Sequence, residues 1–173
     1  MHAIRTRLLP ELMRRGFENV PLPPPEVGPM DRELIVTQPF GMLRRPGPQG
    51  LELVEIQLAP RGRAAFRLNI GIVPYAGIEG IYGPIAPDKV PVGWLNGYYH
   101  LYRCPFLWTW FSVRRWAWRK PAQIDYDDLV ERVVRLIPEV EMVLREGKQG
   151  PHVRFIKIDH PIEQIRMRLR GEG

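Results

Sequence analysis

One stretch of the chain concentrates the residue types that can bind a partner or a ligand. In residues 108–120, tryptophan rings that can stack stand beside arginines that can pair with phosphates or carboxylates. Trp94 lies a short way upstream and adds another large aromatic side chain. The candidate binding residues are Trp94, Trp108, Trp110, Arg114, Arg115, Trp116 and Trp118.

Three interpretations of this stretch fit its pattern. Aromatic residues interleaved with cations are typical of proteins that hold single-stranded nucleic acid. Tryptophan and arginine are also enriched at the energetic centres of protein–protein interfaces. In the third interpretation, the stretch is a strand whose tryptophans pack in the core while the arginines extend to water. Arg114 would interrupt the apolar face of such a strand, which favours an interface or a bulge. We expect a protein partner, with nucleic acid as the alternative.

Other kinds of site find little support in the residue spacing. The four histidines and the single cysteine, Cys104, lack the spacing of a metal centre. The glycines of residues 71–83 lack the spacing of a phosphate-binding loop, and no helix pattern follows them. Ser112 has no flanking glycines of a nucleophile elbow. We therefore expect no catalytic residue, no metal and no cofactor, and an enzyme of unrecognised class stays open as an alternative.

A hairpin and two helices form the framework that must position the binding residues. Residues 64–72 alternate strictly between apolar and polar side chains, and with the strand expected over 51–58 they predict an antiparallel hairpin. Apolar residues at helical spacing predict two helices, over 3–15 and over 125–145. Pro10 is expected to bend the first helix or to precede its start, and Pro138 to kink or split the second. The inward-facing residues of the second strand and of the long helix are expected to share one core: Phe66, Leu68, Ile70, Ile72, Leu129, Val133, Leu136 and Ile137.

Weaker patterns complete the expected element order. They predict an extended connector at 20–30, a turn at 46–50, a long ordered loop at 74–95, and a set of short elements. These are strands over 33–38, 40–45, 96–104, 108–118 and 152–158, and a helix over 161–170. Tight turns without a regular strand–helix alternation favour an α+β fold, with a mainly antiparallel sheet and helices packed on one face. The length of 173 residues fits a single domain spanning 1–173.

Charge and hydropathy narrow the expected partners and location. The net charge is +6, so an acidic surface on the partner is expected, although the acidic residues are mixed along the chain. No stretch approaches the roughly 20 apolar residues that span a bilayer, and the first residues lack the apolar segment of a secretory signal. We expect a cytoplasmic protein without a membrane segment, and its oligomeric state stays open.

Three short patterns, in order, resemble an uncharacterised bacterial family of small α+β domains. A Gly16-Phe17 pair follows the first helix, Gln57 ends one strand, and Phe66, Asn69 and Gly71 form an aromatic-x-x-N-x-G pattern in the next strand. Residues 20–30 and 74–95 depart from the pattern of that family. The resemblance implies a domain without established catalysis, of a kind found among bacterial immunity and interaction modules, and it assigns no catalytic residues. The expected function is a non-catalytic, protein-binding domain of immunity or adaptor type.

Overall fold

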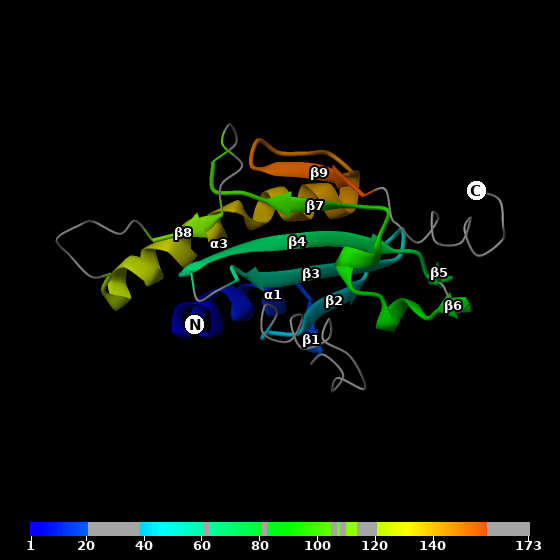
Figure 1. Cartoon of the computed structure of the whole chain (residues 1–173), viewed down its shortest axis with the longest axis horizontal. Helices are drawn as coiled ribbons and strands as arrows, with labels where there is room; N and C mark the ends of the chain where they lie inside the picture. The colour runs from blue at the N-terminus through cyan, green and yellow to red at the C-terminus, as the bar shows by residue number, and fades with distance from the viewer. Residues whose placement is uncertain are drawn as a thin grey trace.

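The computed structural model in Figure 1 confirms the α+β class. It describes residues 1–20, 39–60, 63–80, 83–104, 107, 110–113 and 121–158. Within them, a mainly antiparallel, seven-stranded sheet packs against helices. No helix in these ranges combines the length and apolar character that crossing a membrane requires. The strand expected over 33–38, the helix over 161–170 and nearly all of the connector at 20–30 lie outside the described residues.

The sheet is built around the hairpin that the alternating pattern predicts. Its spatial order is β1 (Glu18–Val20), β2 (Met42–Pro46), β3 (Leu51–Leu58), β4 (Ala65–Val73), β7 (Gly97–Leu101) and β9 (Val153–Lys157). Strand β8 (Phe111–Ser112) also pairs with β4, at residues 65 and 66. Every strand pair in the described part of the sheet is antiparallel, and in the hairpin Ile56 lies opposite Leu68. The strict alternation of β4 therefore gives the sheet two faces of different chemistry.

Helix α3 (Gln123–Glu146) and the N-terminal helical segment cover the first face of the sheet. In the main core, Phe66, Leu68 and Ile70 of β4 lie in one cluster with Leu129, Val133 and Ile137 of α3, while Ile72 and Leu136 pack at its margin. The expected packing of this strand under this helix is therefore confirmed. Figure 1 shows α3 running lengthwise along the strands, so one helix covers much of the sheet.

In both helical segments, the structure around the proline differs from the one expected. The first begins as a π-helical turn (Ile4–Leu8) that continues into α1 (Leu9–Arg14), so the helix does not start after Pro10. A wider turn before Pro10 suits a residue without an N–H to donate. Helix α3 continues through Pro138 as one element of 24 residues. Asp125 lies in the first turn of α3, and its carboxylate accepts the Ala122 N–H at 2.7 Å.

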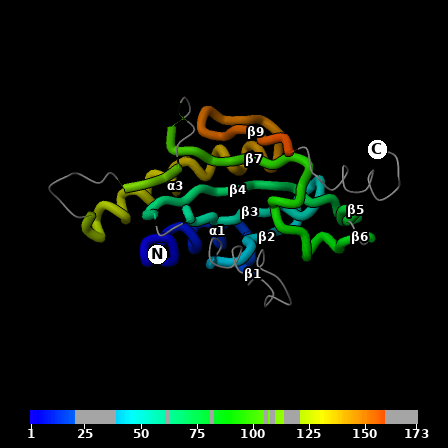
Figure 2. Tube along the Cα trace, in the orientation of Figure 1, coloured from blue at the N-terminus to red at the C-terminus, as the bar shows by residue number. Residues whose placement is uncertain are grey.

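The segment expected to be a loop over 74–95 contains short elements instead. Strands β5 (Ile78–Gly80) and β6 (Gly83–Ile85) pair, and two 3₁₀ turns follow at Pro87–Lys89 and Val92–Trp94. This segment packs on the second face of the sheet, where Val90, Val92 and Leu95 form a smaller core with residues of β3, β4 and β7. A Cβ at Gly71 would lie 2.5 Å from the Leu95 side chain, so this packing needs a glycine there. Figure 2 shows the β5–β6 hairpin at the end of the sheet opposite β8.

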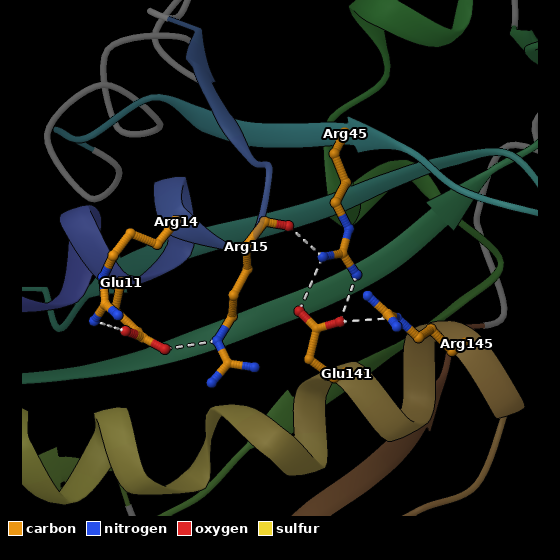
Figure 3. A network of polar contacts seen from close by, with 6 residues as sticks. All are labelled: Glu11, Arg14, Arg15, Arg45, Glu141 and Arg145. Atoms are coloured by element: carbon orange, nitrogen blue, oxygen red, sulfur yellow. Dashed lines mark hydrogen bonds and ion pairs between the residues drawn. The ribbon is translucent and has the colours of Figure 1, made fainter.

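A network of arginines and glutamates joins the first helix, the sheet and α3 (Figure 3). Arg45 of β2 donates to Glu52 of β3 at 2.6 Å and to both carboxylate oxygens of Glu141 at 3.0 and 2.7 Å. It also donates to the carbonyl oxygen of Arg15 at 2.6 Å, at the end of the first helix. Burial lowers the pKa of Arg45, but its bonds to Glu141 and Glu52 outweigh burial and raise it. This arginine is fully committed to structure.

Candidate binding site on the second face of the sheet

A group of polar side chains occupies the part of the second face nearer to β8. In β4, Arg67 and Asn69 point away from the main core because they alternate with Leu68 and Ile70. The register places Gln57 of β3 opposite Arg67 and His100 of β7 opposite Asn69. Together with Tyr102, these residues form the site that we call the polar cluster: Gln57, Arg67, Asn69, His100 and Tyr102.

Hydrogen bonds across three strands hold the polar cluster together. The Gln57 Oε1 atom accepts from Arg67 Nε at 2.9 Å and from Asn69 Nδ2 at 3.0 Å. The Nδ1 atom of His100 lies 2.9 Å from the Tyr102 hydroxyl and 3.4 Å from Arg67 Nη1. Since a guanidinium can only donate, Nδ1 acts as the acceptor, and the proton of the neutral ring lies on Nε2.

Two buried atoms of the polar cluster have unused hydrogen-bonding capacity. Among the residues that the structure describes, neither Asn69 Oδ1 nor His100 Nε2 has a hydrogen-bond partner. Both residues are 4% exposed, and they are direct cross-strand neighbours. The pair thus combines one acceptor with one donor on adjacent strands. Buried polar atoms are nearly always paired, so this pair marks a place where a bound group or water completes the structure.

Arg67 carries a positive charge that the described residues do not neutralise. Its guanidinium lies 4.6 Å from the centroid of the Trp110 ring. Burial lowers its pKa, and only the weak influence of Tyr98 and Tyr102 opposes this shift. No carboxylate of the described ranges forms an ion pair with it, and buried Glu55 instead accepts the Val92 N–H at 2.8 Å. Arg67 therefore differs from Arg45, whose charge two glutamates balance.

His100 acts in this site as a neutral hydrogen-bonding group. Burial, together with the nearby charge of Arg67, lowers its pKa to about 3. A general base or acid works best with a pKa near the working pH, so this imidazole is poorly suited to proton transfer near pH 7. In the described parts of the chain, no group of three or more His, Cys, Asp or Glu side chains converges as metal ligands would.

The low pKa of His100 predicts a specific dependence of stability on pH. The unfolded chain binds a proton at His100 below about pH 6.5, whereas the folded chain does so only near pH 3. Stability from this residue is therefore complete above pH 6.5 and is lost progressively as the pH falls from there toward 3. We expect His100 to reduce the free energy of unfolding by about 2 kcal/mol between pH 7.5 and pH 5.

Urea denaturation at the two pH values measures this effect, and a His100→Gln variant is the control. The variant has no imidazole to titrate at this position. The decrease in its free energy of unfolding between pH 7.5 and pH 5 should therefore be smaller than that of wild type by about 2 kcal/mol. Equal losses in both proteins would contradict the assignment of His100 as a buried neutral group.

Only part of the predicted binding surface can be located. Trp110 contacts the polar cluster through Arg67, and it is partly buried. Trp94 is 43% exposed and belongs to the turn that packs near Gly71, at a different part of the second face. The structure thus does not place these two tryptophans in one patch. Trp108, Arg114, Arg115, Trp116 and Trp118 lie outside the described residues.

The sequence did not single out the polar cluster as a site. The alternation of β4 indicated that Arg67 and Asn69 share a face, but a polar face in a hairpin ordinarily points to water. The sequence feature that could have indicated the polar cluster is the pattern of Gln57, Asn69 and Gly71 on which the family resemblance rests. In the structure, Asn69 donates a hydrogen bond to Gln57. No protein-family model, curated protein or solved structure matches this chain, so its function has to be argued from the site itself.

Proposed function

We propose that this chain is a non-catalytic binding domain, of adaptor or immunity type in the bacterial cytoplasm, that recognises a partner protein through Arg67 and Trp110. The observation that carries the proposal is the charge of Arg67 beside the Trp110 ring, which no carboxylate of the described residues balances. We expect the partner to present an aspartate or glutamate to this guanidinium, in keeping with the net charge of +6.

The arrangement around Arg67 suits the recognition of a carboxylate. Gln57 holds the Nε atom, and the Trp110 ring lies against the guanidinium, so its orientation is set before a partner arrives. A pre-oriented guanidinium loses less conformational entropy when it forms the two parallel bonds that a carboxylate accepts. Partial burial has already removed part of its hydration, so an acidic side chain would restore interactions that water no longer supplies. Arginine and tryptophan side chains in such surroundings are typical interface hot spots.

Two observations favour a protein partner over the alternatives. One face of the Trp110 ring contacts Arg67, so that face cannot stack on a nucleotide base. The one hydroxyl of the polar cluster, that of Tyr102, lies beside His100, but a histidine with a pKa of about 3 is too weak a base to activate it. The unused capacity of Asn69 and His100 lies in the same cluster and supports binding as its role.

Charge reversal at Arg67 tests this proposal. Proteins captured by the tagged full chain from its native cells would be purified and titrated against wild type and an Arg67→Glu variant. Because a hot-spot charge contributes about 2–4 kcal/mol, the variant should bind at least tenfold more weakly, and an Arg67→Lys variant should be intermediate. An Arg145→Glu variant changes a 67% exposed arginine of α3 and should retain the affinity.

The outcomes separate the hypotheses. Equal affinity of wild type and Arg67→Glu, with both proteins folded by circular dichroism, would remove Arg67 from the interface. Tight, salt-sensitive binding of a single-stranded oligonucleotide would replace the protein partner with nucleic acid.

A further inference from the structure

A second group of arginines, none of them in an ion pair with a carboxylate of the described residues, lies on the helical face beside α3. Two adjoining cavities there share Arg103, Leu129 and Arg132 as lining residues. The first has a volume of about 290 Å³ and is also lined by Arg135 and His152. Leu129 belongs to the main core, so this site is on the face of the sheet opposite the polar cluster.

The first cavity, which we call the arginine cavity, is positively charged. Arg132 and Arg135 are three residues apart in α3 and so project from the same side of the helix. Arg103 enters from the segment after β7, where its Nη1 atom donates to the Ser112 carbonyl oxygen at 2.9 Å. None of these three arginines forms an ion pair with any carboxylate of the described residues, in contrast to Arg7, Arg15, Arg45 and Arg145.

No carboxylate is among the residues that line the arginine cavity. Glu139 is engaged by His152, whose backbone N–H and Nδ1 atom lie 2.8 and 2.7 Å from its carboxylate. That contact orients the His152 ring, and the side chain lines the cavity. Asp125 and Asp128 line only the adjoining cavity of about 240 Å³, and Asp125 accepts the Ala122 N–H at the start of α3. Arg103 and Arg132 thus line both cavities, whereas Asp125 and Asp128 line only the adjoining one.

We propose that the paired cavities bind a small phosphate monoester with a hydroxylated organic part, such as a sugar phosphate. Guanidinium groups match phosphate oxygens in geometry and charge, and three of them surround the arginine cavity. Hydroxyl groups on the organic part would donate to Asp125 and Asp128 in the adjoining cavity. The two cavities, of about 290 and 240 Å³, are small, which favours a compact ligand of this kind over a larger cofactor. This site lies on the face of the sheet opposite Arg67, so it is independent of the partner surface.

Calorimetric titration of the full chain with ribose 5-phosphate, ribose and inorganic phosphate tests the proposal. Ribose 5-phosphate should bind most tightly, inorganic phosphate at least tenfold more weakly, and ribose not measurably. An Arg132→Gln/Arg135→Gln variant should bind ribose 5-phosphate at least tenfold more weakly than wild type. An Asp128→Asn variant should weaken ribose 5-phosphate without weakening inorganic phosphate, because the carboxylate contacts only the organic part and its charge repels the phosphate.

Two controls keep this result separate from the partner surface. The Arg67→Glu variant should bind ribose 5-phosphate like wild type, and the Arg132→Gln/Arg135→Gln variant should bind the partner protein like wild type. Absence of binding at millimolar ribose 5-phosphate, or equal binding by wild type and the folded double variant, would overturn the proposal. Tighter binding of a long polyanion such as heparin than of ribose 5-phosphate would also overturn it, since it would mark an extended basic surface.

Discussion

Replacing Arg45 with alanine is expected to lower the free energy of unfolding by about 3–5 kcal/mol. Arg45 is 8% exposed, and the glutamate that it pairs with on β3, Glu52, is 1% exposed. Removal of the guanidinium leaves two carboxylates, Glu52 and Glu141, without their cation in a place where water cannot replace it. The change also breaks the contacts that join β2 to the first helix and to α3 (Figure 3).

A second arginine of the same network provides the matched control. Arg145 also pairs with Glu141, at 3.2 Å, but its side chain is 67% exposed. An Arg145→Ala substitution should therefore cost less than about 1 kcal/mol. A triple variant, Arg45→Met/Glu52→Gln/Glu141→Gln, removes all three charges and should recover much of the loss. Urea denaturation measures all of these values, and an Arg45→Ala protein as stable as wild type would contradict a structural role for the network.

The comparison of arginines explains why the site could not be located by residue type alone. Arg45 and Arg67 both occupy strands of the sheet and both lie against an aromatic ring, at 4.4 Å from Phe17 and 4.6 Å from Trp110. They differ in the balancing carboxylates, which reach Arg45 from a neighbouring strand and from α3. This difference depends on strand register and helix placement, neither of which follows from the local pattern of side chains.

The parts of the fold that the sequence predicts well are those with a strong local period. Strand β4, in which apolar and polar side chains alternate strictly, is displaced by a single residue from the expected range. Its hairpin partner β3 begins and ends at the expected residues. Helix α3 follows from its apolar stripe, and that stripe also predicts correctly which strand it covers.

The segment 74–95 shows where local patterns stop being informative. Its strands have three residues each, and its turns contain glycines and prolines, so no period can develop. What orders the segment is its contact with the sheet, in particular the packing of Leu95 over Gly71 and the bond from the Val92 N–H to Glu55. Such long-range contacts appear only once the chain has folded, and the same is true of the polar cluster, which combines side chains of β3 and β4 with His100 of β7.

Replacing Leu68 with aspartate is expected to be the most damaging single change in the core, lowering the free energy of unfolding by about 5 kcal/mol or more. Leu68 is fully buried between Ile56 and Leu101 on the neighbouring strands. The substitution loses the apolar contacts of leucine and places a carboxylate where the described core offers no cation. Since the free energy of unfolding of a native protein is about 5–15 kcal/mol, the variant should be largely unfolded or melt at a much lower temperature.

Two further variants keep this result interpretable if Leu68→Asp does not fold. Leu68→Ala removes the contacts without adding a charge and should cost about 2–5 kcal/mol, a loss that urea denaturation can measure in a protein that still folds. Leu107→Asp makes the same chemical change at a side chain that is 72% exposed, and it should alter stability by less than about 0.5 kcal/mol. If Leu68→Asp and Leu107→Asp melted at the same temperature, β4 could not lie beneath α3 in the register described. Arg67 and Asn69 would then not lie on the second face of the sheet, because a shift of one residue would turn both side chains toward the helix.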